Sequence, residues 1–182
     1  SASCTSKPKT RIWLELPANG QVILQAIKTI GGTSIDDCII TGCQSVLSPI
    51  DNRFSCDEDI NKINLLAKRL ASFSDQKLKK YNAVLCFEYY AELDDMLDLT
   101  HNLDCYDHDP DITSPAGYAE SVLQKAGIDI GDPAFLYFDF SGLGLRLLEK
   151  HGTMFTPYGI VKRNEKAFKH ELTSSHQKMT PV

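Results

Sequence analysis

Residues 101–111, with the sequence HNLDCYDHDPD, contain the densest group of side chains that could bind a metal. Imidazole and thiolate are ligands that zinc prefers, and His101, Cys105 and His108 lie close together in this segment. Structural zinc sites usually contain paired cysteines, and the sequence has no C-x-x-C pair. The surrounding carboxylates suit a turn equally well. We therefore expect no metal site, and a small metal-dependent enzyme that uses this segment is the least favoured hypothesis.

The same segment carries alternating carboxylates, Asp107, Asp109 and Asp111, like the first half of a calcium-binding loop. The EF-hand pattern then requires glycine at the sixth position and glutamate at the twelfth. Ile112 and Tyr118 occupy these positions, so the pattern fails where the geometry is most demanding. The sequence also has no P-loop, nucleophile elbow or dinucleotide fingerprint. The motifs therefore give no sign of a cofactor site or of an active site, although catalytic groups that meet only in space would leave no such motif.

Charged residues are unevenly distributed along the chain. Residues 81–140 contain 13 Asp and Glu but a single basic residue, Lys125, which gives this block a net charge of −12. Residues 1–80 have a net charge of +3 and residues 141–182 of +4, so the total of −5 conceals the acidic block. Such asymmetry indicates an electrostatic role, although a charged surface that only maintains solubility is the simpler interpretation.

The composition, 182 residues with 42% hydrophobic and 24% charged, is that of a folded protein of one to three small domains. The net negative charge argues against a basic nucleic-acid-binding protein, so we expect no direct contact with nucleic acid. The apolar runs are too short to span a membrane, and the polar start shows no signal peptide. Six cysteines are too few for a disulfide framework, and we interpret them as free thiols in a reducing cytoplasm.

The first part of the chain predicts a small α+β domain over residues 1–54. Residues 10–16 alternate between apolar and polar side chains as a strand does, and residues 37–43 predict a second strand. Between them, apolar residues from Ile23 to Ile30 follow helical spacing. Residues 1–9 are polar, and we interpret them in part as a cloning remnant outside the fold.

Residues 55–102 predict a helical middle domain. Ser55 and Glu58 fit a capping box, and an apolar stripe from Ile60 to Phe73 follows. A second helix begins at Ser74 or Asp75. A third carries apolar residues on one side and acidic residues on the other, namely Glu92, Asp94, Asp95 and Asp98. Like charges at this spacing weaken a helix slightly, which favours a purpose for the acidic face.

Residues 103–182 predict a C-terminal α+β domain with a polar tail. Ser114 and Pro115 are typical of a helix start, and Gly127 is typical of a helix end. The other predicted elements are a strand at 135–140, a helix at 143–150, a hairpin around Pro157, and a tail that frays from Asn164.

Four segments resemble the ArdA-type antirestriction proteins of mobile genetic elements. Residues 102–111 begin with the NLDCY sequence common in that family, and residues 117–127, GYAESVLQKAG, are similar to its LGxYxxxxxG helix. Residues 137–161 resemble the family's DYExxGRDL…GxFTxxGYI ending, and residues 59–85 resemble its INxLNxLAxxL helices. The four segments occur in the family's order, and the resemblance extends over about residues 54–162.

The resemblance implies an elongated α+β chain of three small domains that forms a homodimer. It also implies a DNA mimic, which occupies the DNA-binding groove of type I restriction–modification enzymes without catalysis. Because duplex DNA carries one charge per about 1.7 Å of axis, 12 net charges match about 20 Å of duplex. Where relatives often carry Glu and Asp, this chain has Ser141 and Leu145, so another DNA-binding defence protein, such as a CRISPR effector, stays open as the target.

The predicted partner-binding surface is therefore a set of carboxylates, none of which is expected to be catalytic. A hypothesis of a different class is a mobile-element regulatory protein that binds another protein through apolar and aromatic patches, without mimicry. Salt separates the two, because only the mimic's binding should weaken steeply with ionic strength. The predicted surface comprises Glu92, Asp94, Asp95, Asp98, Asp104, Asp107, Asp109 and Asp111, extended by Glu120, Asp129 and Asp132.

Overall fold

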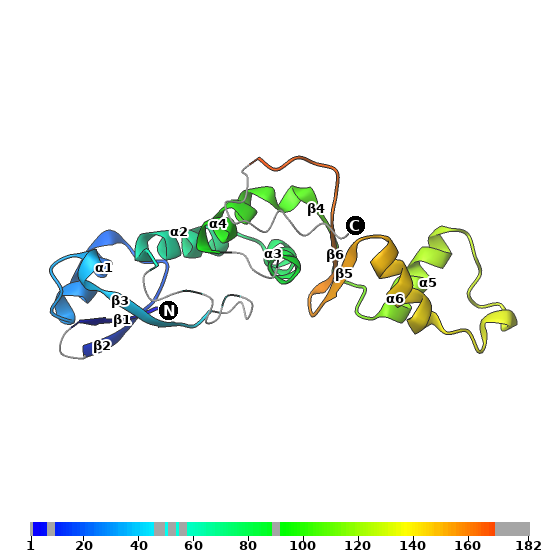
Figure 1. The fold of residues 1–182 in the computed structure, drawn as a ribbon, viewed down its shortest axis with the longest axis horizontal. Coiled ribbons are helices and arrows are strands. Elements are labelled where there is room, and N and C mark those ends of the chain that lie inside the picture. The colour runs from blue at the N-terminus through cyan, green and yellow to red at the C-terminus, as the bar shows by residue number, and fades with distance from the viewer. Residues whose placement is uncertain are drawn as a thin grey trace. The chain divides into compact units, whose positions relative to one another are not determined.

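The computed structural model is a mixed α+β fold, as predicted, with six α-helices and two three-stranded antiparallel sheets in the part of the chain that it describes (Figure 1). It divides into two compact units, and each is described by itself. Unit 1 holds the described residues up to Asp75 and those of 92–101, and unit 2 holds those of 76–88 and 102–169. The three domains expected at 1–54, 55–102 and 103–182 stay a prediction. The described residues are 2–6, for the backbone only, 10–45, 50, 54, 58–88 and 92–169.

Among the described residues, no helix combines the length and apolar character needed to cross a bilayer.

The helices and strands of both units are short. The described residues also form three 3-10 turns, and two of these, η3 and η4, lie at the predicted site residues Asp104 and Asp132. Unit 1 contains β1 (Ala2–Ser6), β2 (Thr10–Leu14), α1 (Gly20–Thr29), η1 (Ile35–Asp37), β3 (Ile39–Cys43), α2 (Ile60–Ala71) and α4 (Leu93–Asn102, whose last residue falls in unit 2). Unit 2 contains α3 (Asp75–Phe87, from its second residue), η3 (Leu103–Cys105), β4 (Tyr106–Asp109), α5 (Pro115–Lys125), η4 (Pro133–Phe135), α6 (Phe140–Lys150), β5 (Thr153–Thr156) and β6 (Gly159–Arg163).

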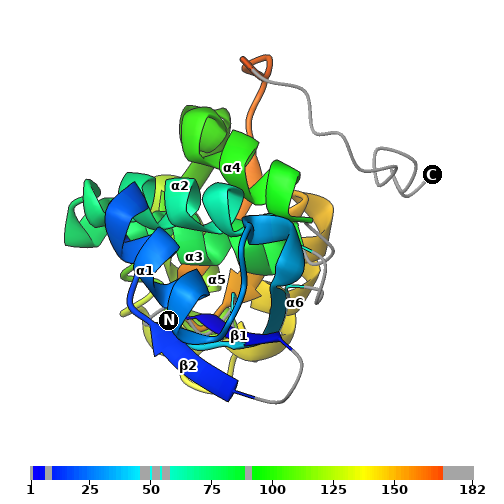
Figure 2. The same cartoon turned by 90° about the vertical axis from the view of Figure 1, so that its left-hand side faces the viewer.

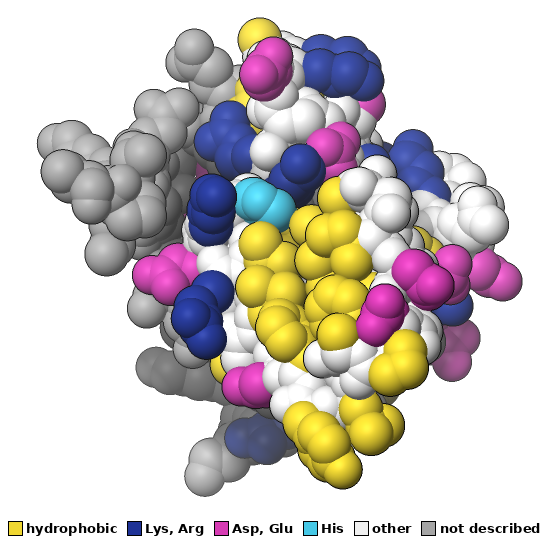
Figure 3. Space-filling view, turned by 90° about the vertical axis from the view of Figure 1, so that its right-hand side faces the viewer, with side chains coloured by type: hydrophobic (Ala, Val, Ile, Leu, Met, Phe, Trp, Pro, Cys, Tyr) yellow, Lys and Arg dark blue, Asp and Glu magenta, His cyan; other side chains and the backbone are white. Residues whose placement is uncertain are grey.

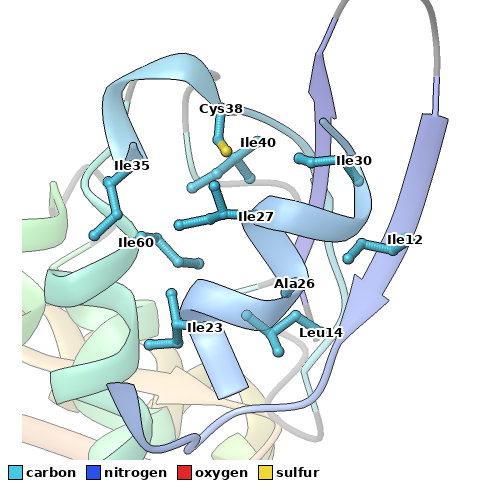
Figure 4. Close-up of a pocket in the computed structure, with 10 residues that line it drawn as sticks. All are labelled: Ile12, Leu14, Ile23, Ala26, Ile27, Ile30, Ile35, Cys38, Ile40 and Ile60. Atoms are coloured by element: carbon cyan, nitrogen blue, oxygen red, sulfur yellow. The ribbon is translucent and has the colours of Figure 1, made fainter. Parts of the chain in front are cut away.

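The sheet of unit 1 has the order β2-β1-β3, with both pairings antiparallel. The interpretation of residues 1–9 as lying outside the fold is therefore wrong, since β1 at Ala2–Ser6 is the central strand. Helix α1 lies against one face of this sheet (Figure 2). The side chains between them are almost all aliphatic and enclose a cavity of about 40 Å³ (Figure 4).

Polar side chains connect the helices of unit 1. The buried Asn64 amide on α2 donates to the carbonyl oxygen of Ala18 and accepts from its N–H, both at 2.8 Å. Arg69, also on α2, donates to the carbonyl oxygen of Leu97 and to the hydroxyl of Thr100. Helix α4 is therefore held by α2 at several points, which buries much of its surface.

Helix α2 begins at Ile60, with Asp59 as N-cap accepting from the N–H of Asn61 at 2.8 Å. The capping box expected at Ser55 and Glu58 predicted an earlier start. Ser55 lies outside the described residues, but the first helical residue is five positions later than that N-cap. Asp59 is a better-placed acceptor for the free N–H groups of the first turn.

The sheet of unit 2 has the order β4-β6-β5, and α5 and α6 form its helical pair. A core of Ile112, Tyr118, Leu148 and Ile160 joins helices and strands. The two helices approach so closely that a Cβ atom on Gly144 would overlap the backbone of Pro115. The expected start of α5, with Ser114 as N-cap and Pro115 next, is confirmed.

Two predictions about unit 2 are wrong. Residues 135–140 run from the end of η4 through a turn to the first residue of α6 and form no strand. The carboxylates of Asp132 and Asp139 cap η4 and α6, each accepting from a backbone N–H at 2.8 Å. The tail does not fray at Asn164. Residues 164–169 are bonded to the segment around Cys105, with the N–H of Asn164 donating to its carbonyl oxygen at 2.9 Å.

Candidate functional site

The predicted acidic surface consists of eleven carboxylates, most of which reach solvent. Ten of them are at least partly exposed, and one is buried. Four belong to unit 1 and seven to unit 2, and the two sets are considered separately. The six residues that are exposed rather than partly buried are Glu92, Asp104, Asp107, Asp111, Asp129 and Asp132.

Helix α4 places its carboxylates in three different environments. Asp95 is 1% exposed, so its assignment to the partner-binding surface is wrong. Helical spacing alone put it beside Glu92 and Asp98, but the packing of α4 also covers that side of the helix. Asp94 is half-exposed and forms an ion pair with Lys62 of α2 at 2.7 Å. Unit 1 therefore offers Glu92, with Asp94 and Asp98 in part, rather than a continuous acidic face.

In unit 2, Asp104 and Asp107 lie among basic residues from the end of the chain. The ammonium of Lys169 is 2.9 Å from Asp104, and that of Lys162 is 3.8 Å from Asp107. The hydrogen bond from Lys169 holds the pKa of Asp104 below its usual value. Burial lowers the pKa of Lys80, although the carboxylates of Asp107 and Asp104 act in the opposite direction. These two predicted acids are therefore paired with cations of the same chain, although both remain exposed.

Other predicted acids have local structural roles. Asp109 accepts from the N–H of Asp111, Asp129 accepts from the N–H of Gly131, and Asp132 accepts from the N–H of Ala134, at 2.8–3.1 Å. These are the short-range bonds by which aspartate stabilises turns and helix starts. Their negative charge still reaches solvent, but the fold alone explains why aspartate stands at these positions.

Three of the predicted acids form neither an ion pair nor a side-chain hydrogen bond with other described residues. The side chains of Glu92, Asp111 and Glu120 show no hydrogen bond or ion pair with other described residues, and Glu92 and Asp111 are exposed. Sequence reasoning did not distinguish these three from the others. They are the carboxylates most available to a partner.

Unit 2 also has a groove of about 290 Å³ beside β4 and β6. Tyr118, Val122 and Ile160 give it an apolar lining, and its charged residues are of both signs. Lys125, the single basic residue of the acidic block, is one of them. The groove is therefore not a uniformly negative surface. Its charged lining residues are Asp107, Asp109, Lys125 and Lys162.

A buried phenol lies beside the acidic residues and was missed by sequence reasoning. Tyr106 is 1% exposed, and its hydroxyl donates to Glu88 at 2.7 Å. Burial, and then the negative charge of Glu88, raises the pKa of Tyr106 well above its usual value. The ring packs against Phe87 and Phe168. The only sequence signal for the burial of Tyr106 was its place in a short strand, and the turn-forming residues that follow Tyr106 obscured that strand.

The residues considered as metal ligands are not brought together. No group of three or more His, Cys, Asp and Glu in the described part of the chain could hold a metal ion. Cys105 is buried, and the Nε2 atom of His108 is bonded to the carbonyl oxygen of Tyr158 at 2.8 Å. The four cysteines that the structure describes, Cys38, Cys43, Cys86 and Cys105, are free thiols.

Unit 2 exposes large apolar side chains as well as acids. The loop before α6 exposes Leu136 at 72% and Tyr137 at 95%, and α6 exposes Leu145 at 59%. Next to them, Phe135, Phe138 and Phe140 pack on one another with ring centroids 5.1–6.0 Å apart. Figure 3 shows hydrophobic side chains gathered on one face, with acidic and basic side chains around them. Such an area is typical of a protein–protein contact.

Neither a protein-family model nor a curated protein sequence matches the chain. The resemblance to the ArdA-type proteins therefore depends on the four sequence segments alone.

Proposed function

We propose that this protein is an ArdA-type antirestriction protein, a cytoplasmic DNA mimic that occupies the DNA-binding groove of a type I restriction–modification enzyme. The proposal includes the homodimer and the elongated three-domain chain that the resemblance implies. It includes no catalysis and no cofactor. The observation that carries it is the acidic block of net charge −12, in which ten of the eleven named carboxylates reach solvent.

The physical argument concerns the groove of the target enzyme. Lys and Arg side chains that normally bind phosphates can bind carboxylates through charge-assisted hydrogen bonds. Carboxylates fixed on folded elements lose little entropy on binding. The ion pairs that Asp94, Asp104 and Asp107 make within the chain reduce the effective charge. Most of the attraction is therefore assigned to acids without such pairs, above all Glu92, Asp111 and Glu120.

The test is displacement of a labelled DNA duplex from a type I methyltransferase by the purified protein. We expect the wild type to displace the duplex, and the triple variant Glu92→Gln, Asp111→Asn, Glu120→Gln to do so about tenfold less well. Three exposed contacts of about 0.5 kcal/mol each amount to that factor. The matched control, Glu15→Gln, Asp36→Asn, Glu149→Gln, makes the same chemical changes outside the block and should keep most of the affinity.

The second candidate is the mobile-element regulatory protein that binds its partner without mimicry. The exposure of Tyr137 and Leu136 favours it, because aromatic and aliphatic side chains of this kind form the centres of protein interfaces. On this hypothesis, Leu136→Ala with Tyr137→Ala should weaken partner binding at least tenfold, whereas the acidic triple variant should not. The same double variant, examined by light scattering, tests whether this area holds the homodimer together.

A further inference from the structure

The segment that follows β6 is held across two of the predicted partner-binding acids. This strap, residues 164–169, has no helix or strand of its own. The side-chain amide of Asn164 donates to the Asp107 carboxylate and to the carbonyl oxygen of Asp104, both at 3.0 Å. At the other end, the ammonium of Lys169 contacts the Asp104 carboxylate at 2.9 Å. The strap thus occupies both carboxylates at once.

Most of the interactions that hold the strap are at the surface. Its one large apolar side chain, Phe168, packs between the Tyr106 ring and the Arg163 guanidinium, whose carbon lies 4.2 Å from the ring centroid. The backbone N–H of Lys169 donates to the Asn102 side chain at 2.8 Å, and the Cys105 thiol donates to the carbonyl oxygen of Ala167 at 3.3 Å. Segments with so few buried contacts open locally at small cost.

We propose that the strap is an internal competitor for the partner's cations, which keeps the Asp104 and Asp107 carboxylates engaged, although both are exposed, until a cationic partner displaces it. This inference rests on the proposed function and adds a regulation of the same surface. The Lys169 ammonium occupies, on Asp104, the position that a lysine or arginine of the partner would take. Any change that opens the strap therefore raises the affinity for a cationic partner, because less must be displaced.

Opening of the strap can be followed without any partner. Cys105 is 1% exposed and lies under the strap, so its alkylation requires the strap to lift. Alkylation followed by peptide mass mapping separates Cys105 from the other cysteines. We expect Phe168→Ala, which removes the aromatic and cation–π contacts, to accelerate Cys105 alkylation about tenfold. Lys169→Gln should accelerate it by a smaller factor.

Binding of a fluorescent oligoarginine peptide tests the competition directly. Lys169→Gln should bind this probe about threefold more tightly than the wild type, which is the scale of one exposed ion pair. Lys28→Gln is the matched control, with the same change of charge on α1 of unit 1. The gain should disappear when Asp104→Asn is combined with Lys169→Gln, because the competition is then already lost.

Unchanged alkylation of Cys105 in both variants would overturn the proposal, since the strap would not be the cover. Faster alkylation with an unchanged or weaker affinity for oligoarginine would also overturn it, since the strap would open without competing. An equal gain in oligoarginine affinity in the Lys28→Gln control would also overturn it, because the gain would then come from the change in net charge alone. The two proposals can fail separately. If the wild type does not displace DNA from the methyltransferase but the strap variants behave as expected, the proposed function is refuted, and the strap competes with a different cationic partner.

Discussion

Helix α4 and the segment from Asp104 onward belong to one acidic block, but they use their carboxylates differently. On α4, Asp95 is buried and Asp94 is paired with Lys62. In unit 2, the acids lie on the edge strand β4, in turns and, for Glu120, on α5, and all of them remain at least partly exposed. A count of charges along a sequence therefore measures neither exposure nor availability. Acids that maintain the fold and acids that are available to a partner should respond differently to substitution.

The largest effect on stability is expected at Gly144, where α5 and α6 of unit 2 approach each other most closely. Gly144→Ala should lower the free energy of unfolding by about 3 kcal/mol, because the new Cβ would overlap the Pro115 backbone and push α6 away from α5. Denaturant titration measures this loss. Gly20→Ala, at a position with open space around its Cβ, is the control and should change stability by less than about 1 kcal/mol. Equal effects of the two changes would contradict the packing described for α5 and α6.

Asp95→Ala should lower the free energy of unfolding by about 2 kcal/mol, because it leaves a cavity at a side chain that is 1% exposed. Asp111→Ala, the same chemical change at an exposed residue, should stay within about 0.5 kcal/mol of the wild type. The two variants are to be compared by thermal and denaturant unfolding. If they were equally stable, the contrast between α4 and unit 2 would be lost.

An acid that caps a helix should be replaceable by a neutral cap. Asp139→Ala should cost about 1 kcal/mol, since the N–H of Gly142 loses its acceptor. Asp139→Asn keeps the acceptor and removes the charge, so its stability should be close to that of the wild type. A loss of the same size in both variants would show that the charge of Asp139, rather than its capping bond, stabilises α6.

The smallest effect is a shift in titration. Because the hydrogen bond from Lys169 lowers the pKa of Asp104 from 3.8, this contact is fully present above that pH and is lost as pH falls through the lowered value. Carboxyl NMR should therefore show Asp104 titrating below 3.8 in the wild type, and closer to 3.8 in Lys169→Gln. An unchanged Asp104 titration in the variant would mean that the strap does not hold this carboxylate in solution.

The sequence predicted those elements whose signals are local. Apolar periodicity predicted α1 and α2, and the pair Ser114 and Pro115 predicted the start of α5. The hairpin around Pro157 is also confirmed, as β5 and β6. Signals of this kind depend on a few neighbouring residues, so these elements could be predicted without knowing how the rest of the chain packs.

Long-range effects explain three of the failures, and local capping bonds explain the fourth. The strand β1 has a polar sequence and forms through its pairing with β2 and β3, which no local pattern announces. The aromatic run before Asp139 resembled a strand, but it forms the end of η4 and a turn, between the helix caps at Asp132 and Asp139. The burial of Asp95 depends on how α4 packs. The ion pair between Asp104 and Lys169 joins residues 65 positions apart, and the one between Asp107 and Lys162 joins residues 55 positions apart.

The central claim is that exposed carboxylates stand in for the phosphates of DNA, and the salt dependence of binding tests it most directly. Titration of a type I methyltransferase with the wild type, at a series of NaCl concentrations, gives the slope of log affinity against log salt. A mimic releases condensed counterions, so the affinity should fall steeply and linearly, and the Glu92, Asp111, Glu120 variant should show a shallower slope. A tight complex whose affinity is independent of salt, with the same slope in that variant, would contradict the account.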